Sequence, residues 1–422
     1  MNRMIIKNGF VVKDDAVIKG NIYIKDGMVL REAEDFDADE VIDAEGLYVF
    51  DGFVDMHVHL REPGFEYKED ILSGTKAAVK GGFTSVCCMP NTNPVCDNPS
   101  VITYIKEKAM AADNCRVYPI GAITKGQKGA EITEMFKLKR AGAVALSDDG
   151  LPVLNGNIMR LAMEYAKTAD ILLICHEEDK EIAADGVVNE GYNATIAGLR
   201  GISRVAEEAM IARDILLSSA LDARVHIAHI STKGSVELIR QAKRLGVKVT
   251  CETCPHYFSA NDSLILSFDT NTKVNPPLRT EADRLAIIDG IKDGTIDVVA
   301  TDHAPHHTND KFVEYNYAAN GISGLETAFA LANTYLVKSR AIDYPRLNRL
   351  MSVNPKKILG ISGGEKERYA DFTIVDTEKK YRIDAKKFVS KGKNTPFNGL
   401  EVQGSVEYTV VGGKIKYKND NK

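Results

Sequence analysis

Two histidines one residue apart could together hold a metal ion. His57 and His59 lie where the mostly apolar run 47–56 gives way to polar residues, in Asp55-Met56-His57-Val58-His59-Leu60-Arg61. Alternate side chains of a strand point to the same side, so both imidazoles are expected to project together, about 6 to 7 Å apart. Imidazole is a common zinc ligand. The pair alone is weak evidence, because two histidines can also be ordinary polar residues.

Other polar side chains that suit metal chemistry follow apolar runs in the same way. They are Asn91, Asp148, Asp149, His176, Glu177, His229, Glu252, His256, Asp302, His303 and His306. All nine histidines fall between positions 57 and 307. Imidazole and carboxylate ligands favour zinc, and an open coordination position would make the site catalytic. Four histidines with Asp149 and Asp302 are enough for one or two ions that assist attack on a carbonyl group.

The elements that must position these residues alternate between apolar runs and helical patterns, which is typical of repeated βα units. Eight runs are expected as strands: 47–60, 83–90, 116–124, 143–147, 171–175, 225–230, 247–251 and 297–301. Helices are expected at 67–80, 98–112, 133–141, 157–169, 203–220, 233–245, 280–292, 323–339 and 344–354. Eight units predict an α/β fold, a (β/α)8 TIM-like barrel, in which the C-terminal ends of the strands converge on the active site.

The two ends of the chain have a different pattern. Short alternating runs broken by turn residues occupy 4–33, and the same style returns at 371–375, 406–411 and 414–417. Such runs predict antiparallel strands joined by tight turns. We therefore expect a small β-sandwich domain built from both termini. The predicted division is 1–46 and 359–422 for the small domain, and 47–358 for the barrel.

Composition excludes several classes of function. The chain has 422 residues, 44% of them hydrophobic, and a net charge of −5. No basic cluster indicates nucleic acid, and no apolar run approaches the ~20 residues of a membrane span. The start of the chain does not resemble a signal peptide, so a cytoplasmic location is expected. Seven scattered cysteines fit buried thiols in a reducing compartment, and this includes Cys251-x-x-Cys254.

Several of the polar residues have a plainer interpretation. Arg61 could be a surface ion-pair partner, and Asn91 could cap a turn between two prolines. Asp148 should face away from Asp149 on a strand, toward solvent or behind the ligands. His226 is expected to be a packed polar residue. Glu252 and His256 are expected either to support the ligands by hydrogen bonds or to be structural, while His303 and His307 are ambiguous.

Five site motifs resemble, in order and spacing, those of dihydroorotases in the cyclic amidohydrolase superfamily. They are His57-Val58-His59-Leu60-Arg61-Glu62-Pro63-Gly64, Met89-Pro90-Asn91-Thr92-Asn93-Pro94, Ser147-Asp148-Asp149-Gly150, Val274-Asn275-Pro276-Pro277-Leu278-Arg279 and Ala300-Thr301-Asp302-His303-Ala304-Pro305-His306. The resemblance continues to 394–397 and 411–414, and so covers essentially the whole chain.

The resemblance implies a role for each matching position. Residues expected around zinc are His57, His59, Asp149, His176, His229 and Asp302. Asp302 would also be the catalytic proton shuttle. Many relatives bridge two metals with a carboxylated lysine from the fourth strand, whereas Lys137 and Lys139 fall in the preceding helix here. Asp149 therefore matches the long bacterial type that uses aspartate, and one or two zinc ions remain open.

The implied reaction is the reversible closure of N-carbamoyl-L-aspartate to L-dihydroorotate in de novo pyrimidine (UMP) biosynthesis. Arg61 would bind the free carboxylate of the substrate with a fork of N–H donors, helped by Asn91 and His306. Asn275 and the backbone at Asn320 and Gly321 would hold the amide edges of the ring.

Two rival functions stay open at this point. Hydantoinases, dihydropyrimidinases and allantoinases resemble the same barrel, but they usually carry the bridging lysine and lack the arginine two places after His-x-His. Some dihydroorotase-like chains are inactive partners of aspartate transcarbamoylase, but those have lost metal ligands. For this chain we expect a small-molecule substrate, no nucleic acid or membrane partner, a homodimer, and association with aspartate transcarbamoylase as a further option.

Overall fold

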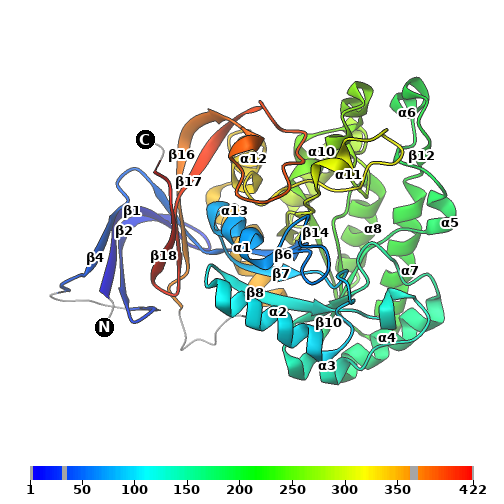
Figure 1. The fold of residues 1–422 in the computed structure, drawn as a ribbon, viewed down its shortest axis with the longest axis horizontal. Helices are drawn as coiled ribbons and strands as arrows, with labels where there is room; N and C mark the ends of the chain where they lie inside the picture. The colour runs from blue at the N-terminus through cyan, green and yellow to red at the C-terminus, as the bar shows by residue number, and fades with distance from the viewer. Residues whose placement is uncertain (1–2, 31–35, 362–368, 421–422) are drawn as a thin grey trace.

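The fold is a barrel of parallel strands with a second sheet at one end, as Figure 1 shows. The structure is a computed structural model that describes residues 3–30, 36–361 and 369–420. The barrel strands are β6 (Phe53–Val58), β7 (Phe83–Cys88), β8 (Arg116–Gly121), β9 (Ala145–Ser147), β10 (Leu172–Cys175), β13 (Val225–Ile227), β14 (Val249–Thr253) and β15 (Val298–Val299). They pair in this order, and every pair is parallel. The prediction of eight parallel barrel strands is therefore confirmed, although the first one is shorter than expected.

The barrel closes where its first and last strands meet. Val58, at the end of β6, forms a parallel bridge with His303, just past β15. The backbone N–H of His59 donates to the carbonyl of His303 at 2.8 Å. An apolar cluster fills the inside of the barrel with residues from most of the strands, among them Val54, Cys87 and Ile174. We call this contact of Val58 and His59 with His303 the seam of the barrel. It joins two parts of the chain that are about 245 residues apart.

Helices cover the outside of the barrel. They are α1 (Ile71–Lys80), α2 (Pro99–Ala112), α3 (Met135–Ala141), α4 (Gly156–Ala169), α7 (Val205–Leu221), α8 (Lys233–Arg244), α10 (Glu281–Asp293) and α12 (Ala328–Ala332), which continues as the π-helical η4 (Asn333–Val337). Their starts carry the expected caps: Asp70 caps α1 and Thr280 caps α10, each in a capping box. α13 (Tyr344–Asn348), η5 (Arg349–Val353) and α14 (Asn354–Leu359) follow.

Short elements decorate the loops between the barrel units. They are α5 (Lys180–Ala183), β11 (Val188–Asn189), α6 (Tyr192–Ala197), β12 (Gly201–Ile202), α9 (Pro255–Ser259) and α11 (Thr308–Lys311). Across the part of the chain that the structure describes, no helix combines the length and apolar character needed to cross a membrane.

The sheet beside the barrel is built from both ends of the chain, as predicted (Figure 1). Its strands are β1 (Arg3–Val12), β2 (Val17–Lys25), β3 (Met28–Val29), β4 (Glu40–Asp43), β5 (Tyr48–Asp51), β16 (Phe372–Arg382), β17 (Glu401–Val411) and β18 (Lys414–Lys418). The two halves join where β5 pairs antiparallel with β16. Met4, Ile42, Phe372 and Val410 contribute to a separate apolar core. The proposed division at 46/47 and 358/359 stays a prediction.

One predicted strand is two strands. The run 47–60 was expected to be the first barrel strand, but β5 belongs to the terminal sheet and only β6 enters the barrel. The break falls at Gly52, whose N–H donates to the carbonyl of Asp371. A Cβ at Gly52 would lie 2.3 Å from the hydroxyl of Thr84, so the tight crossing between the two sheets requires glycine.

Candidate active site

The six predicted metal ligands lie together at the C-terminal ends of the barrel strands. His57 is the fifth residue of β6 and His59 follows that strand, while Asp149, His176, His229 and Asp302 follow β9, β10, β13 and β15. All six side chains are buried. The structure therefore gathers residues that are up to 245 positions apart in the sequence.

Asp149 lies at the centre of this cluster. Its Oδ1 is 3.3 Å from His57 Nε2, 3.7 Å from His176 Nδ1 and 3.6 Å from His229 Nε2. Its Oδ2 is 3.4 Å from His59 Nε2. Asp149 thus belongs to two sets of three ligand atoms that lie within 4.8 Å of one another, one with His57 and His59 and one with His176 and His229.

Asp302 closes the cluster from the other side of the barrel seam. Its Oδ1 is 3.1 Å from His59 Nε2 and 3.5 Å from His57 Nε2. The backbone at Asp302 has a φ of +46°, and Arg61 and His229 also have positive φ values, of +62° and +32°. Such conformations are strained for residues other than glycine and are found most often at functional sites.

The buried carboxylates of the cluster would be stabilised by a bound cation. Burial disfavours a charged His57, but the carboxylates of Asp149 and Asp302 outweigh it and hold the pKa of His57 well above its usual value. Burial also disfavours a charged Asp149, yet the surrounding histidines hold its pKa well below the usual range. Two ionised carboxylates are therefore buried side by side, and a cation would compensate them.

The donor set fits a metal ion. His57 Nε2 is fully buried and has no hydrogen-bond partner among the described residues, although its ring faces Asp149. Imidazole nitrogens and carboxylate oxygens are the ligands that zinc and related ions prefer. A metal site at these strand ends is therefore supported by the residues that the fold brings together.

Hydrogen bonds to their Nδ1 atoms fix the orientation of His57 and His59. His57 Nδ1 is 2.8 Å from Glu252 Oε1, and Glu252 Oε2 is 3.3 Å from His226 Nε2. His59 Nδ1 is 2.9 Å from Asn91 Oδ1. In each case the second ring nitrogen is held, so Nε2 is free to face the carboxylates, as metal-binding histidines require. The expected supporting role of Glu252 is borne out by these contacts, and His226 packs behind it as predicted.

Arg61 is not a surface residue. Its Nε donates to the carbonyl of Pro305 at 3.2 Å, and one terminal nitrogen lies 3.3 Å from His306 Nε2. Burial lowers the pKa of Arg61 to about 10, so it stays charged at neutral pH. The surface ion-pair interpretation is therefore wrong.

His306 is held neutral beside Arg61. Its Nδ1 is 3.3 Å from the ammonium group of Lys68, which can only donate, and its Nε2 is 2.8 Å from the carbonyl oxygen of Asn320. This pattern places the proton on Nε2. Burial, together with the charges of Arg61 and two lysines, lowers the pKa of His306 to about 2.

A cavity of about 200 Å³ opens onto these residues. Its lining includes His59, Arg61, Asn91, Asp149, Gly150, His176, Lys180, His229, Val274, Asn275, Asp302, Ala304, Asn320 and Gly321. The predicted substrate residues are thus at or beside the cavity, although His306 reaches it only through Arg61 and Asn320. The N–H of Gly321 already donates to the carbonyl of Lys273 at 3.0 Å.

Several single-residue predictions need correction. Asn91 does not merely cap a turn, because its Nδ2 also lies 3.5 Å from Asp149 Oδ2. Of the two positions expected for Asp148, the solvent-facing one is wrong: Asp148 is buried and accepts hydrogen bonds from the backbone N–H groups of Ile123 and Thr124, which join the loops that follow β8 and β9. His256 Nε2 has no hydrogen-bond partner among the described residues, so it gives the ligands no support through that atom.

The two ambiguous histidines have structural contacts. His303 Nδ1 accepts from the N–H of Gly324, and its Nε2 is 3.5 Å from Glu69 Oε2. His307 is exposed and caps the short helix α11.

Sequence reasoning missed Glu178 and Lys180. Glu178 Oε2 is 3.3 Å from His176 Nε2 and accepts from Asn275 Nδ2 at 3.0 Å, and it also pairs with Lys180. Glu178 therefore connects a candidate metal ligand with a candidate substrate residue. The signal was available, because Glu178 stands two positions after His176 at the end of a predicted strand, where alternate side chains point to the same side.

The chain is similar to known proteins over its whole length. It is 53% identical to a dihydroorotase of Thermoanaerobacter sp. (strain X514), with 100% of this chain and 98% of that protein covered. It is 56% identical to a dihydroorotase of Acetivibrio thermocellus, with 89% of each protein covered. A family model described as Dihydro-orotase-like matches residues 46–235.

Solved structures of related barrels share the fold. An L-hydantoinase (dihydropyrimidinase) from Arthrobacter aurescens superimposes with a TM-score of 0.88 at 26% identity, covering 98% of this chain and 96% of that one. Half of the residues or more are shared with dihydroorotases but only about a quarter with this hydantoinase. The chain belongs to the dihydroorotase family.

Proposed function

We propose that this chain is a metal-dependent dihydroorotase, which closes N-carbamoyl-L-aspartate reversibly to L-dihydroorotate in pyrimidine biosynthesis. The observation that carries the proposal is that Arg61 lines the same cavity as Asp149 and Asp302. A site that opens or closes a cyclic amide carrying a carboxylate needs groups that act on the amide and, beside them, a positive charge that binds the carboxylate. Dihydroorotate is such a molecule.

The metal would be held by His57, His59, Asp149, His176, His229 and Asp302. Because Asp149 is shared by two sets of ligand atoms, these residues could hold one or two ions. Zinc is the ion we propose, since its usual ligands are imidazole and carboxylate. When bound, the metal would supply Lewis-acid polarisation of the amide carbonyl and stabilise charge that develops on its oxygen.

Asp302 would move the proton in both directions. Its carboxylate faces the cavity next to His59, so it can take a proton from an attacking water and give it to the amide nitrogen as the ring opens. In the closing direction the same oxygen would remove the proton from the ureido nitrogen. A carboxylate that exchanges a proton must lie beside the reacting atoms, and Asp302 is the carboxylate on the Arg61 side of the cluster.

The chain's other residues would orient the substrate. Arg61 would bind the unreactive carboxylate through the N–H groups that Pro305 does not occupy, and Asn91 and His306 would support it. Asn275 and the backbone at Asn320 and Gly321 would line the ring. Glu178 would hold Asn275 in place until the substrate arrives.

The same features weigh against the rival functions. β9, the fourth barrel strand, contains no lysine that could bridge two metals, and the arginine after His-x-His is present. An inactive partner of aspartate transcarbamoylase would lack metal ligands, whereas all six are in place.

One experiment separates these functions. Purified chain should contain zinc and should hydrolyse dihydroorotate, with hydantoin and dihydrouracil assayed in parallel. Hydrolysis of hydantoin or dihydrouracil without any of dihydroorotate would reject the proposed substrate. Protein that binds no zinc and gains no activity from added zinc would point to the inactive partner. The homodimer, association with aspartate transcarbamoylase and the cytoplasmic location stay predictions, and sedimentation with and without the transcarbamoylase would test the first two.

A further inference from the structure

A second group of metal-ligating side chains lies outside the barrel interior. Cys175, Glu177 and Asp214 each offer one ligand atom, and these atoms lie within 4.8 Å of one another. Cys175 ends β10, Glu177 follows it, and Asp214 belongs to α7. None of the three is among the proposed ligands of the active site.

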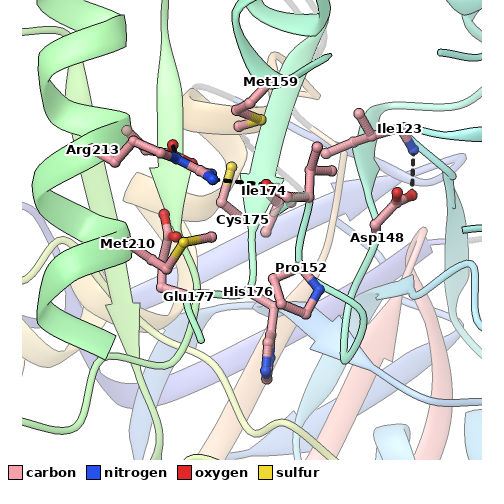
Figure 2. A pocket seen from close by; sticks show the side chains of 12 residues that line it. Ile123, Asp148, Pro152, Met159, Ile174, Cys175, His176, Glu177, Met210 and Arg213 are labelled. Atoms are coloured by element: carbon pink, nitrogen blue, oxygen red, sulfur yellow. Dashed lines mark hydrogen bonds and ion pairs between the residues drawn. The ribbon is translucent and has the colours of Figure 1, made fainter. Parts of the chain in front are cut away.

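Strand alternation separates this group from the active site. Leu172 and Ile174 of β10 belong to the apolar cluster inside the barrel, whereas Leu173 and Cys175 belong to the cluster between strands and helices. His176 therefore points inward again, and Glu177 outward. Figure 2 shows Cys175 and Glu177 near each other, with the ring of His176 directed away from both.

Glu177 is a buried acid that faces a second buried acid, Asp214. It is 2% exposed, and neither of its carboxylate oxygens has a hydrogen-bond partner among the described residues. The same holds for Asp214 Oδ2, while Asp214 Oδ1 accepts from Arg213 Nε at 2.6 Å. Arg213 also donates to the carbonyl of Val153, and its one charge acts on both Asp214 and Glu177, so it cannot compensate both acids. A buried carboxylate in this state is costly unless a cation accompanies it.

We propose that Cys175, Glu177 and Asp214 bind a divalent metal ion of the zinc, cobalt or cadmium class at a second site between β10 and α7. One thiolate and two carboxylates carry three negative charges, and Arg213 balances one of them. A divalent ion would balance the other two. The thiolate selects this class over magnesium or calcium, which take oxygen ligands. The cavity that these residues line is about 10 Å³, enough for one ion or water molecule. The ion would tie the end of β10, which carries His176, to the outer helix α7.

Cobalt distinguishes this site from the active site, because the active-site ligands are only nitrogen and oxygen. Full-length protein is titrated with Co²⁺, and absorption is recorded together with metal content. We expect a thiolate-to-cobalt charge-transfer band that reports one ion per chain. The band should be lost in Cys175→Ser and in Asp214→Asn, and metal content should fall by one ion per chain.

Cys251→Ser is the matched control. Cys251 is equally buried at a barrel strand but donates to the carbonyl of Thr295 outside the group, so this variant should keep the band. Protein that takes up cobalt at the active site without a thiolate band would overturn the proposal, as would a band that survives in Cys175→Ser. If the variants do not fold, ¹¹³Cd NMR of the unaltered chain decides: a sulfur-bound cadmium signal supports the site, and only nitrogen- and oxygen-bound signals refute it.

Discussion

Replacement of Arg61 by methionine tests whether this residue identifies the substrate. Its Nε is used by the carbonyl of Pro305, and one terminal nitrogen is near His306. The other terminal nitrogen has no protein partner among the described residues, and Arg61 lines the cavity. The guanidinium group of Arg61 thus has N–H groups left to bind a carboxylate. Methionine has a similar length but no hydrogen-bond donor.

The expected loss follows from this geometry. Removal of one partner from a buried, hydrogen-bonded charge pair costs about 2 to 5 kcal/mol. That range corresponds to a decrease in kcat/KM for dihydroorotate of about 30-fold to about 5,000-fold. The carboxylate keeps its charge throughout the reaction, so the interaction is nearly equal in ground and transition states. The loss should therefore fall mainly on KM.

Dihydrouracil provides the internal control for this variant. It has the same ring as dihydroorotate but lacks the carboxylate, so any hydrolysis of it should not depend on Arg61. Steady-state kinetics on both substrates should show that Arg61→Met removes most of the preference for dihydroorotate. Arg61→Lys keeps the charge but loses the two-pronged guanidinium donor. Its kcat/KM for dihydroorotate should therefore lie between those of the unaltered chain and Arg61→Met. Equal losses on both substrates would refute the reasoning and place the carboxylate elsewhere.

Three further variants test other parts of the site. Asp302→Asn should keep most bound metal but lower kcat by about 10²-fold to 10⁴-fold, because the proton shuttle is lost; turnover near that of the unaltered chain would remove Asp302 from this role. Glu252→Gln should weaken metal affinity by about 10-fold to 100-fold, measured by competition with a chelator, because His57 loses its partner. Burial opposes the charge of Glu252, but hydrogen bonds from His226 and His57 lower its pKa to about 2. A lowered pKa means that the stabilisation is complete above the ordinary value of 4.5 and is lost as pH falls toward 2. In metal-free protein the stability gap between Glu252→Gln and the unaltered chain should therefore shrink over that interval, as followed by acid unfolding. Gly321→Ala should impair both stability and kcat/KM, because Gly321 has a φ of +147° and a Cβ there would lie 2.6 Å from the carbonyl oxygen of Ala304; Gly198→Ala, also at a positive φ but with open space, is the control that separates strain from crowding.

The barrel strands and the candidate metal-binding residues could be predicted because both follow from short-range sequence patterns. Each strand ends where an apolar run meets a polar residue, and the parallel order places all such ends at one rim. The period of two then assigned His57 and His59 to one side, and their rings are 5.5 Å apart in the structure. No knowledge of distant contacts was needed for these steps.

The predictions for the first strand and for Asp148 were incomplete because they depend on contacts between distant parts of the chain, which a local sequence pattern cannot show. β5 and β6 lie in one mostly apolar run, so periodicity cannot reveal that a sheet change at Gly52 separates them. The pattern left open whether Asp148 faces solvent or lies behind the ligands, and backbone donors in the loop after β8 decide for the buried position. The raised pKa of Asp148, about 6, reflects the same burial.

The seam of the barrel joins active-site residues that lie far apart in the sequence. His59 and Asp302 are 243 residues apart, and Arg61 and His306 are 245 apart, whereas His176 and His229 are separated by only 53. The contact of His59 with Asp302 thus spans the junction of the first and last strands, whereas the contact of His176 with His229 is more local. Contacts of such long range carry the largest loop-closure cost and form late. The strained backbone of Arg61 and Asp302 lies at this seam, next to the His59–His303 hydrogen bond that closes the barrel. Binding of a cation by His57, His59 and Asp302 would therefore stabilise barrel closure itself, so that metal binding and completion of the fold are one equilibrium.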